Sequence, residues 1–482
     1  MKKVYLADEF NIEKIESLEQ GNNYLIGAEC GAGKTTWVEE ILIPHCIKND
    51  KTILLLIHRK SLRNQVLNSL KNIDCCLDNV EIMLYQEVEQ QLLINRFANN
   101  YDFIVCDEIH YLVTDASFNR NTEVVFDMLN KKSRSINILL TGTPNPLAFC
   151  KWDKKPVTLR KPNRYNHNVK NVYLCRESKF NYLLYKRLEQ DEKLIMFVSN
   201  AKNGKEMVDK LKIDGYDAKF ICSDTNSMKR YSSTDIKKQI EDAQNFDCQI
   251  VVMTSVMNTG ISIKDGKITT IFLHGINSVT DIFQSVARVR INNDDEKINV
   301  IIMKPSNKSL ATKIRELDSD LLYVDNVKEW ELKYKRSELP FFVYRADGEF
   351  KVNEMTVAKY RTDRKELDEM IRAYGLKRVL VNMFPKTTVI DLDMNEVKAN
   401  VLEQLNKIVG VDLDKSEQER IKILFNNNST LNDFYEDAGL RKDRLKTTTT
   451  INQMLEHLQS NLRLAVKKIG RDKKTMWIVN KI

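Results

Sequence analysis

A glycine-rich segment near the start of the chain has the residue types and spacing of a phosphate-binding loop. Residues Ala28–Thr36 read AECGAGKTT, follow the apolar residues 24–26 and precede the helical pattern WVEEIL. Glycines let backbone N–H groups turn toward phosphate oxygens, and the start of a helix favours negative charge. In such a loop Lys34 reaches the β- and γ-phosphates, and the Thr35 hydroxyl binds Mg²⁺. The other residues expected to bind ATP in this loop are Gly31, Ala32, Gly33 and Thr36.

Two carboxylates end an apolar run further along the chain. Residues 103–110 read FIVCDEIH, so Asp107 and Glu108 directly follow a strand-like segment. The carboxyl ends of parallel strands open into one crevice, which would bring this pair to the glycine-rich loop. There Asp107 would hold Mg²⁺ through water, and Glu108 would polarise the attacking water. A chance loop and a surface turn are the alternatives, but together the two segments favour ATP hydrolysis.

The elements that must position these residues recur along the first 305 residues. Short β-branched runs alternate with helical stretches there, which is typical of α/β folds with parallel sheets. The number of runs suits two sheets better than one. The expected divisions are a first domain at 1–152, a basic linker at 153–175, a second domain at 176–305, a helical region at 306–410 and a basic C-terminal domain at 411–482.

The C-terminal end is strongly basic. Residues 441–482 contain 11 Lys and Arg against 3 Asp and Glu. A basic turn at 467–474 lies between two β-like runs after predicted helices, which is typical of a winged helix in which Trp477 anchors the wing. A small helical cap with a solvated basic tail is the alternative. The charge favours a polyanion partner, and a replication protein is a further candidate partner for this region.

Composition excludes several classes of protein. The chain has 482 residues, 42% of them hydrophobic, with 75 Lys and Arg against 67 Asp and Glu. No apolar run approaches the ~18 residues that span a bilayer, and the N-terminus lacks the apolar core of a secretory signal. We therefore expect a cytoplasmic protein without a membrane partner (in the host cytoplasm if a phage encodes it). An odd number of cysteines without a CxxC pair disfavours a disulfide scaffold and a zinc ribbon.

Taken in order, the motifs resemble those of a superfamily 2 helicase of the DExH type. GKT, DEIH and the TGTP of residues 141–144 resemble motifs I, II and III. LIHRKSLRNQ at 56–65 resembles motif Ia, and MFVSN at 196–200 resembles motif IV. TSVMNTGIS at 254–262 resembles motif V, and QSVARVR at 284–290 resembles motif VI. The resemblance implies two tandem RecA-like domains with ATP between them and nucleic acid across their top. The QxxxRxR form of motif VI, with TGIS, is similar to origin-binding helicases of herpesviruses and to related phage and mobile-element helicases.

The resemblance also implies roles for the later motifs. Motif VI would complete the ATP site from the second domain, and Arg288 is the first candidate because it shares a helix face with Gln284. Arg290 lies off that face unless the helix unwinds at the Asn292 turn. A salt-bridged surface helix is the alternative for both arginines. In motif V, Gly260 would contact the nucleotide.

Further implied roles concern nucleic acid and its coupling to ATP. Contacts with the phosphate backbone are implied for Arg59, Asn200 and Thr254. Contacts with the phosphate backbone do not depend on the base sequence, which suits a motor that moves along any strand. Coupling between the ATP site and the bound strand is implied for His110, Thr141 and Thr143. Ordinary structural roles are the alternative for each of these residues.

Three functions remain compatible with the sequence. The first is an ATP-dependent DNA helicase or translocase in replication, recombination or repair of phage or mobile-element DNA. The second is an initiator that ATP clamps onto an origin or duplex without unwinding it, which the basic C-terminus favours. The third is an RNA helicase. Enzymes of the DExH type act on either nucleic acid, and no motif in this sequence reads the 2′-OH that distinguishes RNA from DNA.

Overall fold

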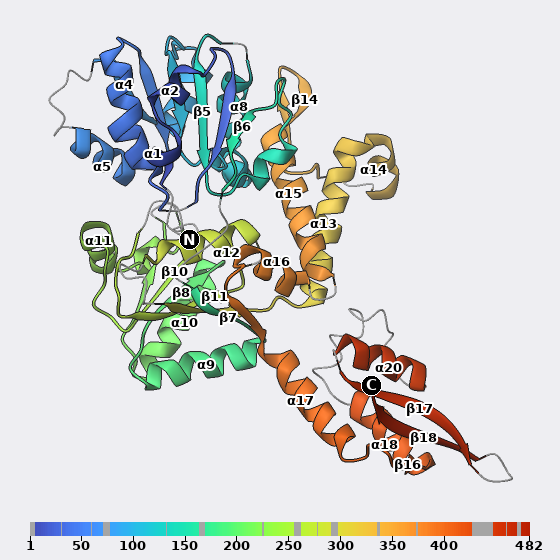
Figure 1. Cartoon of the computed structure of the whole chain (residues 1–482). Helices are drawn as coiled ribbons and strands as arrows, with labels where there is room; N and C mark the ends of the chain where they lie inside the picture. Colours follow the sequence, from blue (N-terminus) through green and yellow to red (C-terminus); the bar gives the residue numbers. More distant parts are fainter. Residues whose placement is uncertain are drawn as a thin grey trace. The chain divides into compact units, whose positions relative to one another are not determined.

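The chain divides into two compact units, each made of segments that are discontinuous in sequence (Figure 1). Unit 1 comprises Met1–Tyr165, Asn258–Ser262 and Lys313–Glu366, and unit 2 comprises Asn166–Met257, Ile263–Thr312 and Leu367–Ile482. The computed structural model describes residues 5–29, 31–58, 60–70, 78–131, 133–162, 169–223, 226–254, 262–276, 278–290, 297–334, 338–372, 375–426, 447–458, 460–469 and 474–482. Among these residues, no helix combines the length and the apolar character needed to cross a membrane.

Unit 1 is built on a six-stranded sheet in the order β3-β2-β4-β5-β1-β6, with every neighbouring pair parallel. Its central strands consist almost entirely of buried apolar residues, as expected for a parallel sheet that helices cover on both faces. The strands are β1 (Asn23–Gly27), β2 (Ile53–Ile57), β3 (Val80–Leu84), β4 (Phe103–Cys106), β5 (Ile136–Thr141) and β6 (Val157–Arg160).

The helices of unit 1 pack against both faces of this sheet. One continuous helical stretch runs from Lys34 to Lys48 as α3 (Lys34–Trp37), a π turn (Val38–Leu42) and α4 (Ile43–Lys48). The π turn precedes Pro44, whose missing N–H interrupts the ordinary helical hydrogen bonds. The others in the first 150 residues are α1 (Leu6–Glu9), α2 (Ile12–Glu16), α5 (Lys60–Leu70), α6 (Tyr85–Leu93), α7 (Tyr111–Thr114), α8 (Thr122–Asn130) and 3₁₀ turns at Asp115–Ser117 and Asn145–Phe149.

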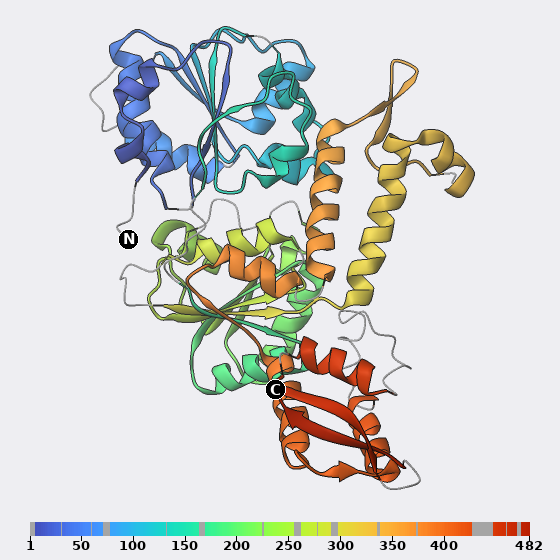
Figure 2. The same cartoon turned by 45° about the vertical axis from the view of Figure 1, so that its right-hand side comes forward.

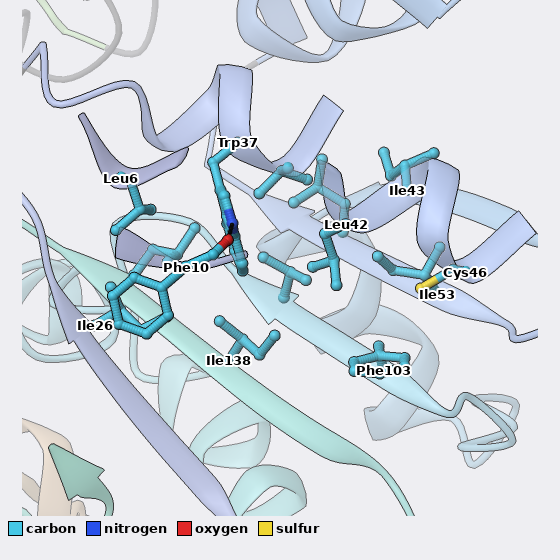
Figure 3. Close-up of a cluster of buried hydrophobic side chains, with 14 of the residues drawn as sticks. Leu6, Phe10, Ile26, Trp37, Leu42, Ile43, Cys46, Ile53, Phe103 and Ile138 are labelled. Atoms are coloured by element: carbon cyan, nitrogen blue, oxygen red, sulfur yellow. Dashed lines mark hydrogen bonds between the residues drawn. The ribbon is translucent and has the colours of Figure 1, made fainter. Parts of the chain in front are cut away.

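One of the hydrophobic clusters of unit 1 holds the N-terminal helices to the sheet (Figure 3). The Trp37 indole N–H donates a hydrogen bond to the Phe10 carbonyl at 2.7 Å, and the two rings meet edge to face. Cys46 is buried in the same cluster. All six described cysteines are free thiols and five of them are buried, so they serve as small core residues.

Unit 2 contains a seven-stranded sheet in the order β15-β7-β12-β11-β8-β10-β9, again with parallel neighbours. The expected fold class, two tandem parallel-sheet α/β domains followed by a mostly helical region, is therefore confirmed. The strands are β7 (Val169–Cys175), β8 (Lys193–Val198), β9 (Ala218–Ile221), β10 (Ile250–Thr254), β11 (Ile268–His274), β12 (Ile298–Met303) and β15 (Thr388–Asp391). The helices that accompany them are α9 (Glu177–Glu189), α10 (Ala201–Ile213), α11 (Thr234–Ala243), α12 (Val279–Arg288) and α16 (Gly375–Met383), with a 3₁₀ turn at Lys229–Tyr231.

The basic linker expected at 153–175 contains two strands instead. β6 pairs with β1 at the edge of the unit 1 sheet, and β7 pairs with β12 in unit 2. In β7, exposed Lys170 alternates with buried apolar residues, so basic side chains project from a strand rather than from a loop. The boundary between the two units still falls within this range, after Tyr165.

The region expected to be helical between 306 and 410 also departs from a purely helical reading. It contains α13 (Asn307–Asp325), α14 (Val327–Tyr334), a hairpin of β13 (Val343–Ala346) and β14 (Glu349–Val352), α15 (Glu354–Ile371), α16 and β15. Asp347 and Gly348 turn the hairpin at positive φ, the backbone state that an Asp-Gly pair favours. Residues 313–366, here called the arm, belong to unit 1, whereas β15 completes the sheet of unit 2.

The chain ends in a small module whose hydrophobic core includes residues of α17, so it begins before the expected position 411. Its elements are α17 (Leu392–Asn406), β16 (Asp412–Leu413), α18 (Lys415–Asn426), α20 (Thr448–His457), β17 (Leu462–Ile469) and β18 (Lys474–Lys481). The three strands are antiparallel in the order β16-β18-β17 (Figure 2). Trp477 is buried in the module's core. Residues 427–446, between α18 and α20, lie outside the described residues, so the winged helix stays a prediction.

Candidate active site

Three loops of unit 1 meet at the carboxyl edge of its sheet. β5 lies between β1 and β4, so the loops after these strands are neighbours. The Ala28 N–H donates to the Thr141 carbonyl at 2.8 Å, and the Ile109 N–H donates to the Leu140 carbonyl at 3.0 Å. These backbone bonds tie the glycine-rich loop and the DEIH segment to the TGTP segment, as the parallel-strand argument predicts.

The glycine-rich loop has the backbone shape that its sequence indicates. Gly31 and Gly33 have φ values of 78° and 79°, which an L side chain adopts only with strain. Gly33 precedes the first residue of α3, so the helix starts directly after the loop. Ala32 is buried, and its carbonyl accepts a hydrogen bond from the Leu6 N–H at 2.9 Å. The N-terminal segment therefore helps to hold the loop in place.

Lys34 and Glu108 form an ion pair at the centre of this edge. Lys34 Nζ lies 2.7 Å from Glu108 Oε1, and the two side chains are only 9% and 12% exposed. Glu108 has a φ of 50°, an unusual backbone state for a residue with a side chain. Strain of this kind costs about 1–3 kcal/mol and often marks functional positions. The predicted phosphate-binding cation and the predicted carboxylate thus lie in direct contact.

Lys34, Thr35 and Asp107 line one small cavity whose walls are otherwise apolar. The Asp107 N–H donates to the Leu56 carbonyl at 2.9 Å, and the Asp107 carbonyl accepts from the Tyr85 hydroxyl at 3.0 Å. Burial raises the pKa of Tyr85, so its hydroxyl stays protonated and remains a donor. Hydrogen bonds at both its N–H and its carbonyl therefore fix the backbone of Asp107.

These residues fit Mg-ATP. A hydroxyl and a carboxylate oxygen are ligands that Mg²⁺ accepts when phosphate oxygens and water complete its octahedron. Within the described part of the chain, no group of three or more His, Cys, Asp or Glu side chains could hold a metal by itself. Thr35 and Asp107 would therefore hold the ion together with the nucleotide.

The three expected coupling residues lie together beside Glu108. His110 Nδ1 is 2.9 Å from Thr141 Oγ1 and 3.4 Å from Glu108 Oε2. The Thr143 N–H donates to Thr141 Oγ1 at 3.0 Å. His110 and Thr141 are fully buried, so this chain of contacts is shielded from water. It joins the carboxylate to the loop after β5.

One supporting residue escaped sequence analysis. Arg160, on edge strand β6, donates from Nη1 to the Gly27 carbonyl at 2.7 Å and to Glu29 Oε2 at 3.0 Å. Its Nε donates to Glu9 Oε2 at 2.6 Å. Arg160 therefore clamps the base of the glycine-rich loop to the N-terminal helices. In the sequence, Arg160 is one of several basic residues in a stretch interpreted as a linker, so nothing marked it out.

In unit 2, Gln284 and Arg288 lie one helical turn apart on α12, and each is 7% exposed. Arg288 Nε is buried without a hydrogen-bond partner among the residues that the structure describes. α12 ends at Arg288, and the Arg290 N–H donates to the Ile263 carbonyl at 2.8 Å. Arg290 thus follows the helix, and the Asn292 segment where unwinding was expected lies outside the described residues.

The residues expected to contact nucleic acid differ from one another in burial and in their hydrogen bonds. Asn200 caps α10, and its side-chain oxygen accepts from the N–H groups of Lys202 and Asn203. Thr254, the last residue of β10, pairs with Val198 of β8 and is 2% exposed. The two residues share one edge of the sheet, but the Asn200 side chain already has a structural task and Thr254 is buried. Arg59 and Gly260 lie outside the described residues.

Neither a family model nor a curated protein matches this chain. Among solved structures, it is similar to Dbp5 of S. cerevisiae bound to RNA and ADP BeF3, with a TM-score of 0.45 and 15% identity over 66% of this chain and 84% of that chain. It is also similar to a DEAD box protein from the hyperthermophile Methanococcus jannaschii, with a TM-score of 0.33 and 16% identity over 65% of this chain and 86% of that chain.

Proposed function

We propose that the chain is a nucleic-acid-stimulated ATPase that acts as a helicase or translocase on DNA. The observation that supports this most directly is the buried Lys34–Glu108 pair, 2.7 Å apart at the carboxyl edge of a parallel sheet. A glycine-rich loop and two candidate Mg²⁺ ligands surround the pair. Few activities other than nucleoside triphosphate hydrolysis use this set of groups in this order.

The ion pair itself indicates how the site would work. Phosphate oxygens at the loop would compete with Glu108 for Lys34, and the shift of Lys34 would leave the Glu108 carboxylate available to a water molecule. Glu108 would then orient that water and accept its proton. Mg²⁺, held by Thr35 and Asp107, would neutralise charge on the β- and γ-phosphates.

An ATP site of this kind also needs a positive side chain from the second domain to stabilise the γ-phosphate, and we assign this role to Arg288 of unit 2. A buried guanidinium nitrogen without a partner is costly, and it is often retained for an anionic ligand. In this proposal Arg288, with Gln284 and secondarily Arg290, contacts the γ-phosphate of the nucleotide that unit 1 binds. Gly260 of motif V would also contact the nucleotide.

Nucleic acid would contact unit 2 near Asn200 and Thr254 and unit 1 near Arg59. The chain of contacts through His110, Thr141 and Thr143 would link that strand to Glu108. The QxxxRxR form of motif VI supports DNA of a phage or mobile element as the substrate. The basic C-terminal module keeps an ATP-clamped duplex-binding initiator as the second candidate.

The proposal is tested by measuring ATPase rates without nucleic acid and with equal amounts of single-stranded DNA, duplex DNA and RNA. We expect single-stranded DNA to stimulate most, and Lys34→Ala to abolish hydrolysis with every partner. Lys131→Ala, an exposed lysine at the end of α8, is the matched control. Strongest stimulation by RNA would replace the DNA assignment, and tight duplex binding without stimulation or strand displacement would favour the initiator.

A further inference from the structure

The C-terminal module presents an exposed polar stripe on α20. Ile451, Met454 and Leu455 of this helix are buried in the module's core. Thr449, Gln453 and Glu456 are exposed, and their i, i+4, i+7 spacing places them on a single face. Two of the three are uncharged side chains that can hydrogen-bond to the edges of bases.

A side-chain amide fixes this helix to the neighbouring β-hairpin of β17 and β18. Asn452 Nδ2 donates to the Leu464 carbonyl at 2.8 Å, and Asn452 Oδ1 accepts from the Leu464 N–H at 2.7 Å. Helix α20 therefore lies against β17 in a defined orientation, as both views of the module show (Figures 1 and 2).

Among the described residues of the module, the hairpin of β17 and β18 is the most basic part. Its two strands present Arg463, Lys467, Lys468, Lys474 and Lys481 as exposed side chains. Only Lys467 has a carboxylate partner within the described residues, Asp412 at 3.0 Å. The first helices of the module differ, because α17 and α18 carry charges of both signs. Lys407, directly after α17, pairs with Glu403, and Lys422 of α18 pairs with Glu419. Within the described part of the module, Arg463, Lys468, Lys474 and Lys481 lack a carboxylate partner on the two strands beside α20, compared with Lys415 and Arg420 on α18.

A helix with short polar side chains and a flanking basic hairpin matches the shape and charge of a DNA duplex. The major groove of B-form DNA is about 12 Å wide and admits an α-helix, whereas the major groove of A-form RNA is deep and narrow. Lysines beside the groove can neutralise phosphates without regard to sequence. The combination selects double-stranded DNA over an RNA duplex.

We infer that the C-terminal module is a DNA-duplex-binding site that works without ATP. Helix α20 enters the major groove with Thr449 and Gln453 toward the bases, and Lys468 and Lys474 at the far end of the hairpin contact phosphates. Asn452 sets the angle between helix and hairpin. The inference rests on the proposed function and extends it, because it assigns binding of the duplex to a surface separate from the ATP-hydrolysing residues.

The inference is tested by fluorescence anisotropy of a labelled DNA duplex with the full-length protein in the absence of nucleotide, over a series of salt concentrations. We expect the K468Q/K474Q variant to bind about tenfold more weakly at ~100 mM salt, with a log–log salt slope shallower by about 2. Gln453→Ala should weaken binding several-fold with an unchanged salt slope. All three side chains are exposed, so the variants should fold normally.

The matched control is K186Q/K407Q, which removes the exposed Lys186 of α9 and the exposed Lys407 that directly follows α17. The inference is overturned if K468Q/K474Q binds like this control, or if an RNA duplex of the same sequence binds as tightly as DNA. Failure here is distinguishable from failure of the ATPase proposal. Lys34→Ala would still abolish hydrolysis if only the duplex site were wrong, and K468Q/K474Q would still weaken duplex binding if only the ATPase were wrong.

Discussion

The side chains around Glu108 form a continuous series of polar contacts. Lys34 approaches one carboxylate oxygen at 2.7 Å and His110 approaches the other at 3.4 Å, while Thr141 lies 2.9 Å from the same His110 nitrogen. Since His110 and Thr141 are buried, loss of one member would leave its neighbours unsatisfied. The series gives the loop after β5 a direct physical link to the carboxylate proposed to activate water.

Replacement of Thr141 by valine tests this link, because valine keeps the shape and removes the hydroxyl. We expect Thr141→Val to lower the free energy of unfolding by about 1–3 kcal/mol. It should also reduce the stimulation of ATPase by nucleic acid more than the unstimulated rate. Urea denaturation and ATPase assays measure both effects. Thr141→Ser keeps the hydroxyl and is the control, so equal behaviour of the two variants would refute the link.

Among the elements, the arm gives unit 1 a part that is distant in sequence. Asn353 Nδ2 donates to the Arg120 carbonyl at 2.9 Å and to Glu123 Oε2 at 3.1 Å, just before α15. The Thr356 hydroxyl donates to the Ala116 carbonyl at 3.1 Å. Met355 of the same helix is buried in the cluster that contains much of α7 and α8. The arm therefore packs against the helices that directly follow the DEIH segment.

Asn353→Ala should weaken this attachment. Asn353 is 1% exposed, and its amide also accepts hydrogen bonds from Thr356, so truncation leaves several buried groups without partners. We expect a loss of about 2–3 kcal/mol in the free energy of unfolding and faster proteolysis within residues 338–366. Asn400→Ala, an exposed asparagine of α17, is the control. Proteolysis at the wild-type rate would show that these hydrogen bonds do not secure the arm.

The parts of the molecule that could be predicted from sequence are those with local signals. A strand, a glycine-rich loop and a helix adjoin in Ala28–Thr36, and an apolar run adjoins its carboxylates in 103–110, so both halves of the unit 1 site were predictable. The clamp by Arg160 was missed because it depends on pairing between β6 and β1, which no local pattern encodes.

Long-range pairing also explains the errors in domain organisation. β15 has four residues and pairs with β7, which lies far upstream, while the arm returns the chain to unit 1. Both units are therefore discontinuous, and divisions drawn as consecutive ranges could not describe them. The hairpin in the arm did have a local signal, the Asp347-Gly348 pair, which sequence analysis overlooked.

In the function proposed above, Arg288 of unit 2 would serve the nucleotide held by unit 1. The ATPase rate of Arg288→Ala in the presence of single-stranded DNA tests it most directly, with Arg230→Ala as a control on an exposed arginine. We expect kcat to fall by about 10³-fold or more with nucleotide binding retained, since such arginines typically contribute 10³–10⁵. An Arg288→Ala rate within about twofold of the Arg230→Ala control would contradict it.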